Sequence, residues 1–322
     1  MSTKKNGTDK TMQMITSAGL AARAMETTLR KHCWPGKMID RSVDATIEEA
    51  HLKDCEPSKA TTTQKKLVDG KYEPLWKAVE KLSRDLGKAW KKDTVIWRDG
   101  GTRLIASTRY MEFAPRIALM RDEYHAAVRL CAESWDEIVQ RQKGRLGDLW
   151  VLEHFPTAEE LVEKCYATLD YQPIQTADDF RIDLPEEWMD DLRQANERAT
   201  QRAIENAMRD PWERLKTVVE AMAKALSIPD KIFRDSLIGN VENLLDLMPD
   251  LNVTGDPTLE AMCSKIRKAL TQGFDAKDVR DPAYKAKQDT DSTANRSSDA
   301  KTLRESKALE ARDILAEINS VM

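Results

Sequence analysis

The 322-residue sequence contains no long apolar run. A helix needs roughly 20 mostly apolar residues to cross a bilayer, and no such stretch occurs. The N-terminal segment, MSTKKNGTDKTMQMITSAGLAARAM, also lacks the apolar core of a secretory signal peptide. These absences predict a cytoplasmic protein that has no membrane partner.

Cysteine is scarce, with five residues at positions 33, 55, 131, 165 and 263. Domains held by disulfides usually carry an even number of cysteines at regular spacings, so no disulfide framework is expected. Cys131, Cys165 and Cys263 fall within helical patterns, where a reduced cysteine usually behaves as a small buried hydrophobic residue. A reducing compartment fits this pattern.

Aromatic residues make up only 6% of the chain, and there are 12 glycines and 12 prolines. Charged residues make up 33%, yet the net charge is only −4. Such a balance is typical of exposed helices with interspersed charges. It provides no overall attraction to nucleic acid or membrane, so any such attraction must be local.

The motifs of the common catalytic classes are missing. Phosphate-binding loops need clustered glycines, because backbone N–H groups must approach the anion, and neither a P-loop nor GxGxxG occurs. The GxSxG elbow and the HExxH zinc motif are absent as well. The sequence therefore predicts a non-enzymatic protein without a cofactor.

Two weak metal patterns remain. His32-Cys33 and His51-x3-Cys55 could assemble a zinc site, although neither half has a CxxC knuckle, and unrelated surface histidines and packed thiols explain them better. Acidic pairs such as Asp178-Asp179 could recruit Mg²⁺, but solvated helix starts are the simpler explanation. No metal site is predicted.

Apolar residues recur every three or four positions along most of the chain, which predicts amphipathic helices. The predicted helices cover residues 11–31, 73–91, 112–153, 157–170, 185–226, 229–248, 257–271 and 301–320. Thr157 and Glu160 predict a capping box, and a short strand is expected at 180–182. The apolar stripes of 113–138 and 188–226 approach a heptad repeat, so these long helices are expected to pack antiparallel like a coiled coil.

The predicted fold is mainly α: an elongated antiparallel helical arm with one small β-hairpin and a flexibly tethered C-terminal helix. Residues 1–10 are expected to be disordered. Residues 11–110 form an N-terminal helical region with the hairpin, and 111–272 form the arm and a helical bundle. Residues 273–300 lack an apolar period and predict a flexible linker before the C-terminal amphipathic helix, 301–322.

The segment VIWRDGGTRLIA, residues 95–106, is the predicted hairpin, with Asp99-Gly100-Gly101 as its turn. Two interpretations stay open. The hairpin is either a β-tip that binds a groove or pairs with a partner's edge strand, or a structural plug between helices. An isolated two-stranded ribbon favours a covering partner in either case.

Basic and aromatic residues alternate around this hairpin, from Arg84 to Arg121. Basic side chains neutralise phosphates and aromatic faces stack bases, so this region is the best nucleic-acid candidate in the sequence. The alternative function is therefore DNA or RNA binding. Its candidate residues are Lys88, Lys91, Lys92, Trp97, Arg98, Arg103 and Arg109.

The leading functional hypothesis is a protein–protein adaptor that forms homo-oligomers through the heptad faces of its long helices. The C-terminal helix would act as a docking peptide for a partner. The apolar residues expected to make that contact are Leu303, Leu309, Ile314, Leu315 and Ile318.

Several short motifs also resemble a known family. They are WPGK (34–37), GTR (101–103) ahead of a long helix, FPT (155–157) and FRI (180–182). Their order over residues 25–185 is similar to an uncharacterised family of tailed-bacteriophage and prophage proteins, carried as a domain of unknown function. The resemblance implies a phage-type protein in the cytoplasm of an infected bacterial host. Members are often encoded near a MoxR-type AAA ATPase, which makes such an ATPase a candidate partner.

Overall fold

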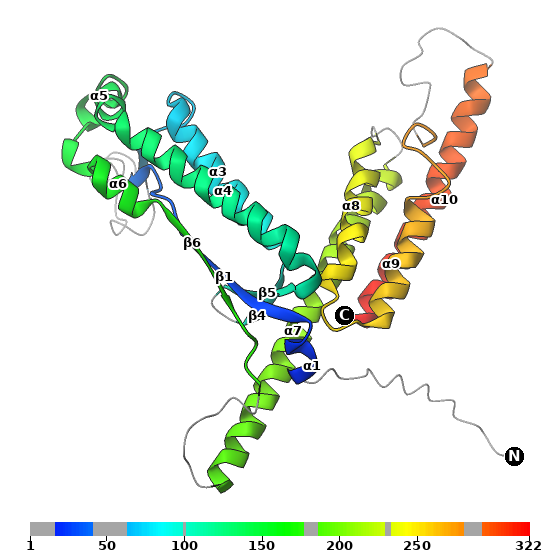
Figure 1. Cartoon of the computed structure of the whole chain (residues 1–322). Coiled ribbons are helices and arrows are strands. Elements are labelled where there is room, and N and C mark those ends of the chain that lie inside the picture. The colour runs from blue at the N-terminus through cyan, green and yellow to red at the C-terminus, as the bar shows by residue number, and fades with distance from the viewer. Residues whose placement is uncertain (1–16, 41–62, 99–100, 177–185, 229–232, 280–291) are drawn as a thin grey trace, which may run out of the picture. The chain divides into compact units, whose positions relative to one another are not determined.

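A computed structural model describes residues 17–40, 63–98, 101–176, 186–228, 233–279 and 292–322 (Figure 1). Most of these residues are helical, which confirms the mainly α prediction. The helices are α1 (Ser17–Ala21), α3 (Pro74–Lys92), α4 (Ser107–Glu133), α5 (Trp135–Leu146), α6 (Ala158–Lys164), α7 (Glu186–Ser227), α8 (Asp235–Leu251), α9 (Pro257–Leu270) and α10 (Ser292–Val321). The strands are β1 (Ala24–His32), β2 (Lys37–Ile39), β3 (Gln64–Lys66), β4 (Val95–Arg98), β5 (Thr102–Ala106) and β6 (Tyr166–Gln172).

The chain divides into two compact units, and neither is continuous in sequence. Unit 1 contains the residues up to Thr27 together with 93–110 and 171–322. Unit 2 contains residues 28–92 and 111–170. Three elements, β1, α4 and β6, have residues in both units.

The predicted hairpin is present, but the sheet is larger than one hairpin. β4 and β5 pair antiparallel, with Val95 opposite Leu104, and the strand order is β4-β5-β1-β6. The predicted helix over 11–31 is therefore wrong after Ala21, where α1 ends, and β1 begins at Ala24. The helix predicted over 157–170 is also too long, because α6 ends at Lys164 and β6 follows. Strand pairing overrides the local helical pattern at both places.

The capping box that begins α6 is confirmed. The Thr157 side chain accepts a hydrogen bond from the Glu160 backbone N–H, and the Glu160 carboxylate accepts one from the Thr157 N–H. The expected disorder at 1–10 and the strand at 180–182 lie outside the described residues. Residues 280–291 of the expected linker, 273–300, lie outside them as well. The prediction is wrong for 292–300, which are helical because α10 begins at Ser292.

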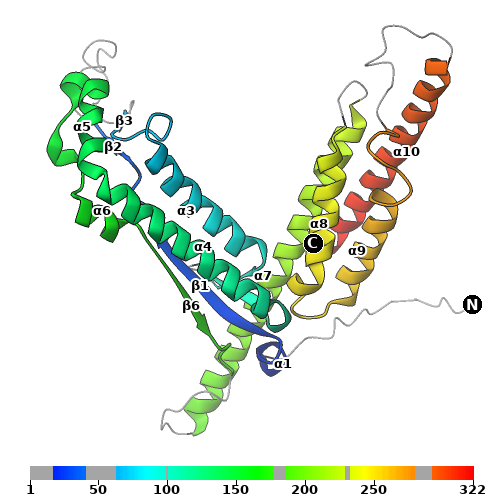
Figure 2. The ribbon, with the colours of Figure 1, turned by 45° about the horizontal axis from the view of Figure 1, so that its top comes forward.

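Unit 1 is built around a bundle of α7, α8, α9 and α10 (Figures 1 and 2). Apolar side chains on α7 recur every three or four positions and are buried: Ile204, Met208, Trp212, Leu215, Val219, Met222 and Leu226. This is the pattern of an amphipathic helix whose stripe faces a core. The same core contains Val95 and Trp97 of the hairpin.

The C-terminal helix is a member of this bundle, so its predicted role as a free docking peptide is wrong. α10 packs on α7 and α9. Ile314 and Ile318 are buried, Leu303 and Leu315 are partly buried against the same core, and only Leu309 is exposed among the five candidates. Because these side chains are already covered by their own chain, they cannot serve as an open docking face.

Arg304 of α10 also completes the end of α7. Its buried guanidinium donates hydrogen bonds to the carbonyls of Ala225 (2.7 Å), Leu226 (3.0 Å) and Ile228. The last carbonyls of a helix have no intrahelical partners, and a basic side chain satisfies them well. α10 is therefore fixed by polar contacts as well as by its apolar face.

The predicted coiled-coil-like arm is not confirmed. Within unit 1, α7 packs mainly on α10, α8 and β4, with a smaller contact to α1. The long helix predicted over 112–153 is in fact two helices, α4 and α5, which are separated at Ser134. Its apolar stripe is buried as predicted, from Phe113 through Tyr124 to Ile138.

Unit 2 places α3 beside α4, as both ribbon views show (Figures 1 and 2). It also contains a cluster of three tryptophans, Trp34, Trp76 and Trp135. The Trp34 ring centroid lies 5.5 Å from that of Trp76 and 5.6 Å from that of Trp135, both edge-on. Gly36 has a φ of +64°, and a Cβ there would lie 3.0 Å from Nε1 of Trp76. The WPGK motif therefore needs its glycine for both conformation and space.

None of the helices in the described part of the chain is long and apolar enough to cross a membrane.

Candidate functional site

The structure places the central residues of the predicted nucleic-acid surface inside unit 1. Trp97 is 1% exposed, and its indole N–H donates to the Glu26 carboxylate at 2.8 Å. Arg103 is buried and donates to Asp210 at 2.8 Å and to Thr94. The expectation that they form one exposed basic-aromatic surface is wrong, because both groups are committed to internal contacts. Val95, Trp97 and Leu104 of the hairpin belong to the unit 1 core, which favours the structural interpretation of the hairpin.

The other candidate residues are distributed differently. Arg98 is exposed, with its guanidinium 5.6 Å from the centre of the Trp97 ring. Arg109 is half-buried and lies 3.9 Å from Asp250. Lys88, Lys91 and Lys92 are exposed on α3, which belongs to unit 2. Of the predicted set, Lys88 and Lys91 enter the site described below.

One side of α3 carries a continuous row of basic residues. Its members are exposed and recur every three or four positions: Lys77, Lys81, Arg84, Lys88 and Lys91. Residues at this spacing lie above one another on a helix. We call this row the basic face. At 1.5 Å per residue it is about 21 Å long.

A groove of about 570 Å³ lies beside the basic face, between α3 and the end of β1. Its lining includes the basic side chains Lys31, Arg84, Lys88 and Lys91, with Glu80 as the acidic one. The partly exposed Trp34 and Cys33 also line it. We call this hollow the basic groove. It combines several positive charges with an aromatic ring.

The electrostatics of the groove favour an anionic ligand. Lys31 lies at its wall and donates to the Ser83 hydroxyl at 3.1 Å. Burial lowers the pKa of Lys31, and the ammonium of Lys91 lowers it further, against a raising effect of Cys33. An anion between these ammonium groups would relieve their repulsion. Gly87 leaves the groove open, because a Cβ there would lie 3.1 Å from Cε of Lys31.

Lys31, Lys77 and Lys81 lie outside the basic region that the sequence predicts, whereas Arg84 is the first residue of that region. The sequence pattern places Lys31 in a helix over 11–31, so it does not predict a contact with residues 74–92. Lys77 and Lys81 are recognised only when charge is followed around the helix and not along the chain. The spacing of the basic residues within 74–92 was the signal that could have found them.

The described residues do not contain a group of three or more His, Cys, Asp or Glu side chains that could hold a metal ion. His51 and Cys55, two of the four residues of the weak zinc pattern, lie outside the described residues, as do Asp178 and Asp179. His32 contacts the Lys164 carbonyl through Nδ1. The zinc and magnesium patterns thus gain no support from the residues that can be placed.

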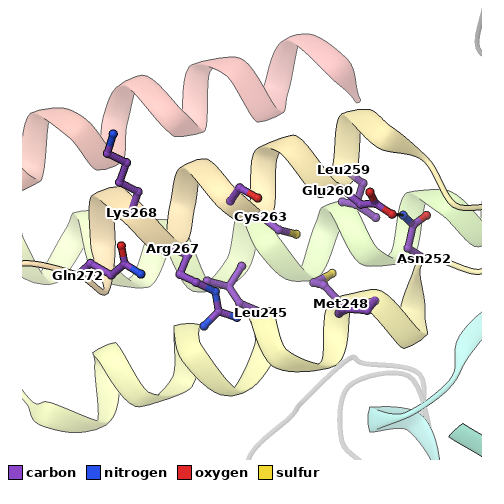
Figure 3. A pocket seen from close by; sticks show the side chains of 11 residues that line it. Leu245, Met248, Asn252, Leu259, Glu260, Cys263, Arg267, Lys268 and Gln272 are labelled. Carbon is purple, nitrogen blue, oxygen red and sulfur yellow. Dashed lines mark hydrogen bonds between the residues drawn. The ribbon is translucent and has the colours of Figure 1, made fainter. Parts of the chain in front are cut away.

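A second hollow, of about 350 Å³, lies between α8 and α9 in unit 1 (Figure 3). Leu245, Met248 and Leu259 give it apolar walls. Arg267 is paired with Asp246 at 2.7 Å, and burial raises the pKa of Cys263 to about 11, which keeps that thiol protonated at neutral pH. This hollow offers less to a charged ligand than the basic groove does.

Comparisons with models of protein families, with curated proteins and with solved structures find no match to this chain. The phage-type family and its ATPase partner therefore remain predictions of the sequence. The basic face and the basic groove must be interpreted from their own chemistry.

Proposed function

We propose that this protein is a non-enzymatic nucleic-acid-binding accessory protein, which holds single-stranded DNA or RNA along the basic face and in the basic groove of unit 2. The observation that carries the proposal is the row of five exposed basic residues on α3 beside a groove lined by Lys31 and Trp34.

The dimensions favour a single strand over a duplex. A groove of about 570 Å³ has the volume of a pocket for a small molecule, so it can admit one or two nucleotides but not a double helix. A strand with one phosphate per roughly 3.4 Å presents about six phosphates over the length of the basic face. Trp34 offers an aromatic surface on which a base can stack.

Fluorescence anisotropy with a labelled oligothymidylate tests this proposal. If the five basic residues each neutralise one phosphate, log affinity should fall with log salt at a slope of about −3.5. Unlabelled oligothymidylate should displace the probe at far lower concentration than thymidine monophosphate does. Equal competition by the mononucleotide would restrict the site to nucleotides and refute strand binding.

A charge-reversal pair localises the binding. The double variant Arg84→Glu/Lys88→Glu should weaken binding roughly tenfold or more at low salt and make the slope shallower by about 1.4. Arg129→Glu/Lys143→Glu is the matched control, because both residues are exposed in unit 2 and the net charge changes equally. Equal losses in the two double variants would show that only net charge matters.

A second candidate function is self-association through α4, in line with the predicted homo-oligomer. Three large apolar residues of this helix, Met111, Leu119 and Leu130, are exposed. A second copy of the chain could cover them, since exposed apolar side chains are often buried at interaction sites. Light scattering after size-exclusion chromatography should show a larger species in the unmodified chain and a monomer in Leu119→Glu. A monomer in both removes this candidate.

A further inference from the structure

Two cysteines far apart in the sequence meet in unit 2. Cys33 directly follows β1, and Cys165 lies between α6 and β6, the strand next to β1 in the sheet. The side chains of Cys33 and Cys165 lie close enough for each thiol to shift the pKa of the other. The Trp34 backbone N–H also donates to Cys165 Sγ, at 3.3 Å. The two sulfurs are therefore held together by the ends of two neighbouring strands.

The two thiols differ in access. Cys33 is partly exposed and lines the basic groove, whereas Cys165 is 2% exposed and lies behind it. Cys131 is fully buried, and burial raises its pKa to about 12. A reagent that enters the groove therefore contacts Cys33 first. Cys165 is the buried sulfur next to Cys33.

Their electrostatics suit exchange chemistry. The neighbouring Cys33 thiol lowers the pKa of Cys165 to about 7, with help from the Trp34 N–H and against burial. The neighbouring Cys165 thiol, together with burial, raises the pKa of Cys33. At neutral pH the pair therefore loses one of its two protons readily and then carries one thiolate. A thiolate is the reactive form of cysteine in disulfide exchange.

We propose that Cys33 and Cys165 form a reversible disulfide by exchange with an anionic low-molecular-weight disulfide, such as glutathione disulfide, that enters through the basic groove. The carboxylates of such a disulfide outnumber its ammonium groups, which complements Lys31, Arg84 and Lys88. The proposal depends on the groove and the thiol pair and does not require nucleic-acid binding.

The exchange proceeds in two balanced steps. The Cys33 proton passes to Cys165, and the Cys33 thiolate attacks one sulfur of glutathione disulfide. The Cys33–glutathione bond forms, the glutathione S–S bond breaks, and the leaving thiolate takes a proton from water. Cys165 then loses its proton to solvent and attacks the Cys33 sulfur, which releases the second glutathione. Two protein thiols are oxidised and one glutathione disulfide is reduced to two glutathiones.

The test treats the full chain with glutathione disulfide at neutral pH, blocks the remaining thiols and maps the peptides by mass spectrometry. We expect a Cys33–Cys165 cross-link in the unmodified chain and in the control Cys131→Ser, and its loss on adding dithiothreitol. Cys165→Ser should trap one glutathione on Cys33, whereas Cys33→Ser should leave Cys165 unmodified. Absence of the cross-link from the folded, unmodified chain would overturn the proposal, as would glutathione on Cys165 in Cys33→Ser.

A second measurement tests the role of the groove. Lys88→Glu should slow the reaction with glutathione disulfide several-fold and leave the rate with the neutral bis(2-hydroxyethyl) disulfide unchanged. Equal rates with both reagents in the variant and the unmodified chain would show that the basic groove plays no part. Because neither arm contains an oligonucleotide, failure here and failure of nucleic-acid binding are separate results.

Discussion

At the scale of single residues, the most consequential group is the buried ion pair between Arg103 and Asp210. Asp210 also accepts hydrogen bonds from Arg214 and from the Ile96 backbone N–H at 3.1 Å. Arg103 in turn donates to both the hydroxyl and the carbonyl of Thr94. One guanidinium therefore joins the hairpin to α7.

Arg103→Met should destabilise unit 1 by about 3 kcal/mol, because removing one partner leaves buried acceptors and a buried carboxylate with fewer donors. Urea denaturation followed by circular dichroism measures the loss. Arg98→Met is the matched control: Arg98 is exposed on the same hairpin, and its loss should stay within about 0.5 kcal/mol. Similar losses in both variants would contradict a structural role specific to Arg103.

His125 makes stability depend on pH. Its Nε2 accepts a hydrogen bond from the Ala167 backbone N–H at 3.1 Å, which requires the neutral ring. Burial lowers the pKa of His125, and Arg121 and Arg129 lower it further. His125 therefore binds a proton more readily in the unfolded chain than in the folded chain. The stability that neutral His125 contributes is complete above about pH 6.5 and is lost as pH falls through the lower pKa of the folded state.

His125→Gln keeps an acceptor near the Nε2 position but cannot be protonated. Its free energy of unfolding should therefore fall less between pH 7.5 and pH 5.5 than that of the unmodified chain, as measured by chemical denaturation at both values. An identical fall in the two proteins would mean that His125 does not contribute to the pH dependence.

Residue types alone could not reveal which charges are buried. The sequence shows Arg103 and Lys88 as equivalent members of one basic stretch, yet the structure buries the first and exposes the second. Asp210, the carboxylate that pairs with Arg103 and allows its burial, lies 107 positions away in the sequence. Pairing at that separation is set by the packing of α7 on β4, which no local pattern encodes.

At the scale of elements, helices with a strong apolar period were predictable. α3, α7, α8 and α9 begin and end within a few residues of their predicted limits, apart from the later start of α8. The strands β1 and β6 were not predictable, because neither alternates cleanly between buried and exposed residues along its whole length. A strand becomes recognisable from its neighbours in the sheet, and those neighbours are far away in the sequence.

α10 offers a direct test of docking within the chain. Ile314 is 1% exposed in the unit 1 core, and Leu309 on the same helix is 60% exposed. Ile314→Ala should cost about 2–5 kcal/mol through lost burial and a cavity. Leu309→Ala removes the same amount of side chain from the surface and should change stability by no more than about 0.5 kcal/mol. Equal effects in chemical denaturation would show that α10 is not docked as described.

At the scale of the whole molecule, the chain order hides the organisation. Each unit is assembled from segments separated by long insertions: residues 93–110 belong to unit 1, while the stretches on either side of them belong to unit 2. The sequence pattern predicts consecutive ranges instead, because apolar periodicity reports which face of an element is buried and not which element covers it. The basic groove was hidden for the same reason, since β1 and α3 contribute to it from different parts of the chain.

This organisation predicts that destabilisation stays within one unit. Ile314→Ala in unit 1 should accelerate backbone hydrogen exchange in α7, α9 and α10 while leaving α3 and α5 as protected as before, since local stability follows cooperative units. Ile138→Ala, in the core of unit 2, should do the reverse. Mass spectrometry of deuterated peptides resolves both patterns. If either variant accelerates exchange throughout the described helices, the chain unfolds as one cooperative body. The two units would then differ in their internal contacts but would not unfold independently.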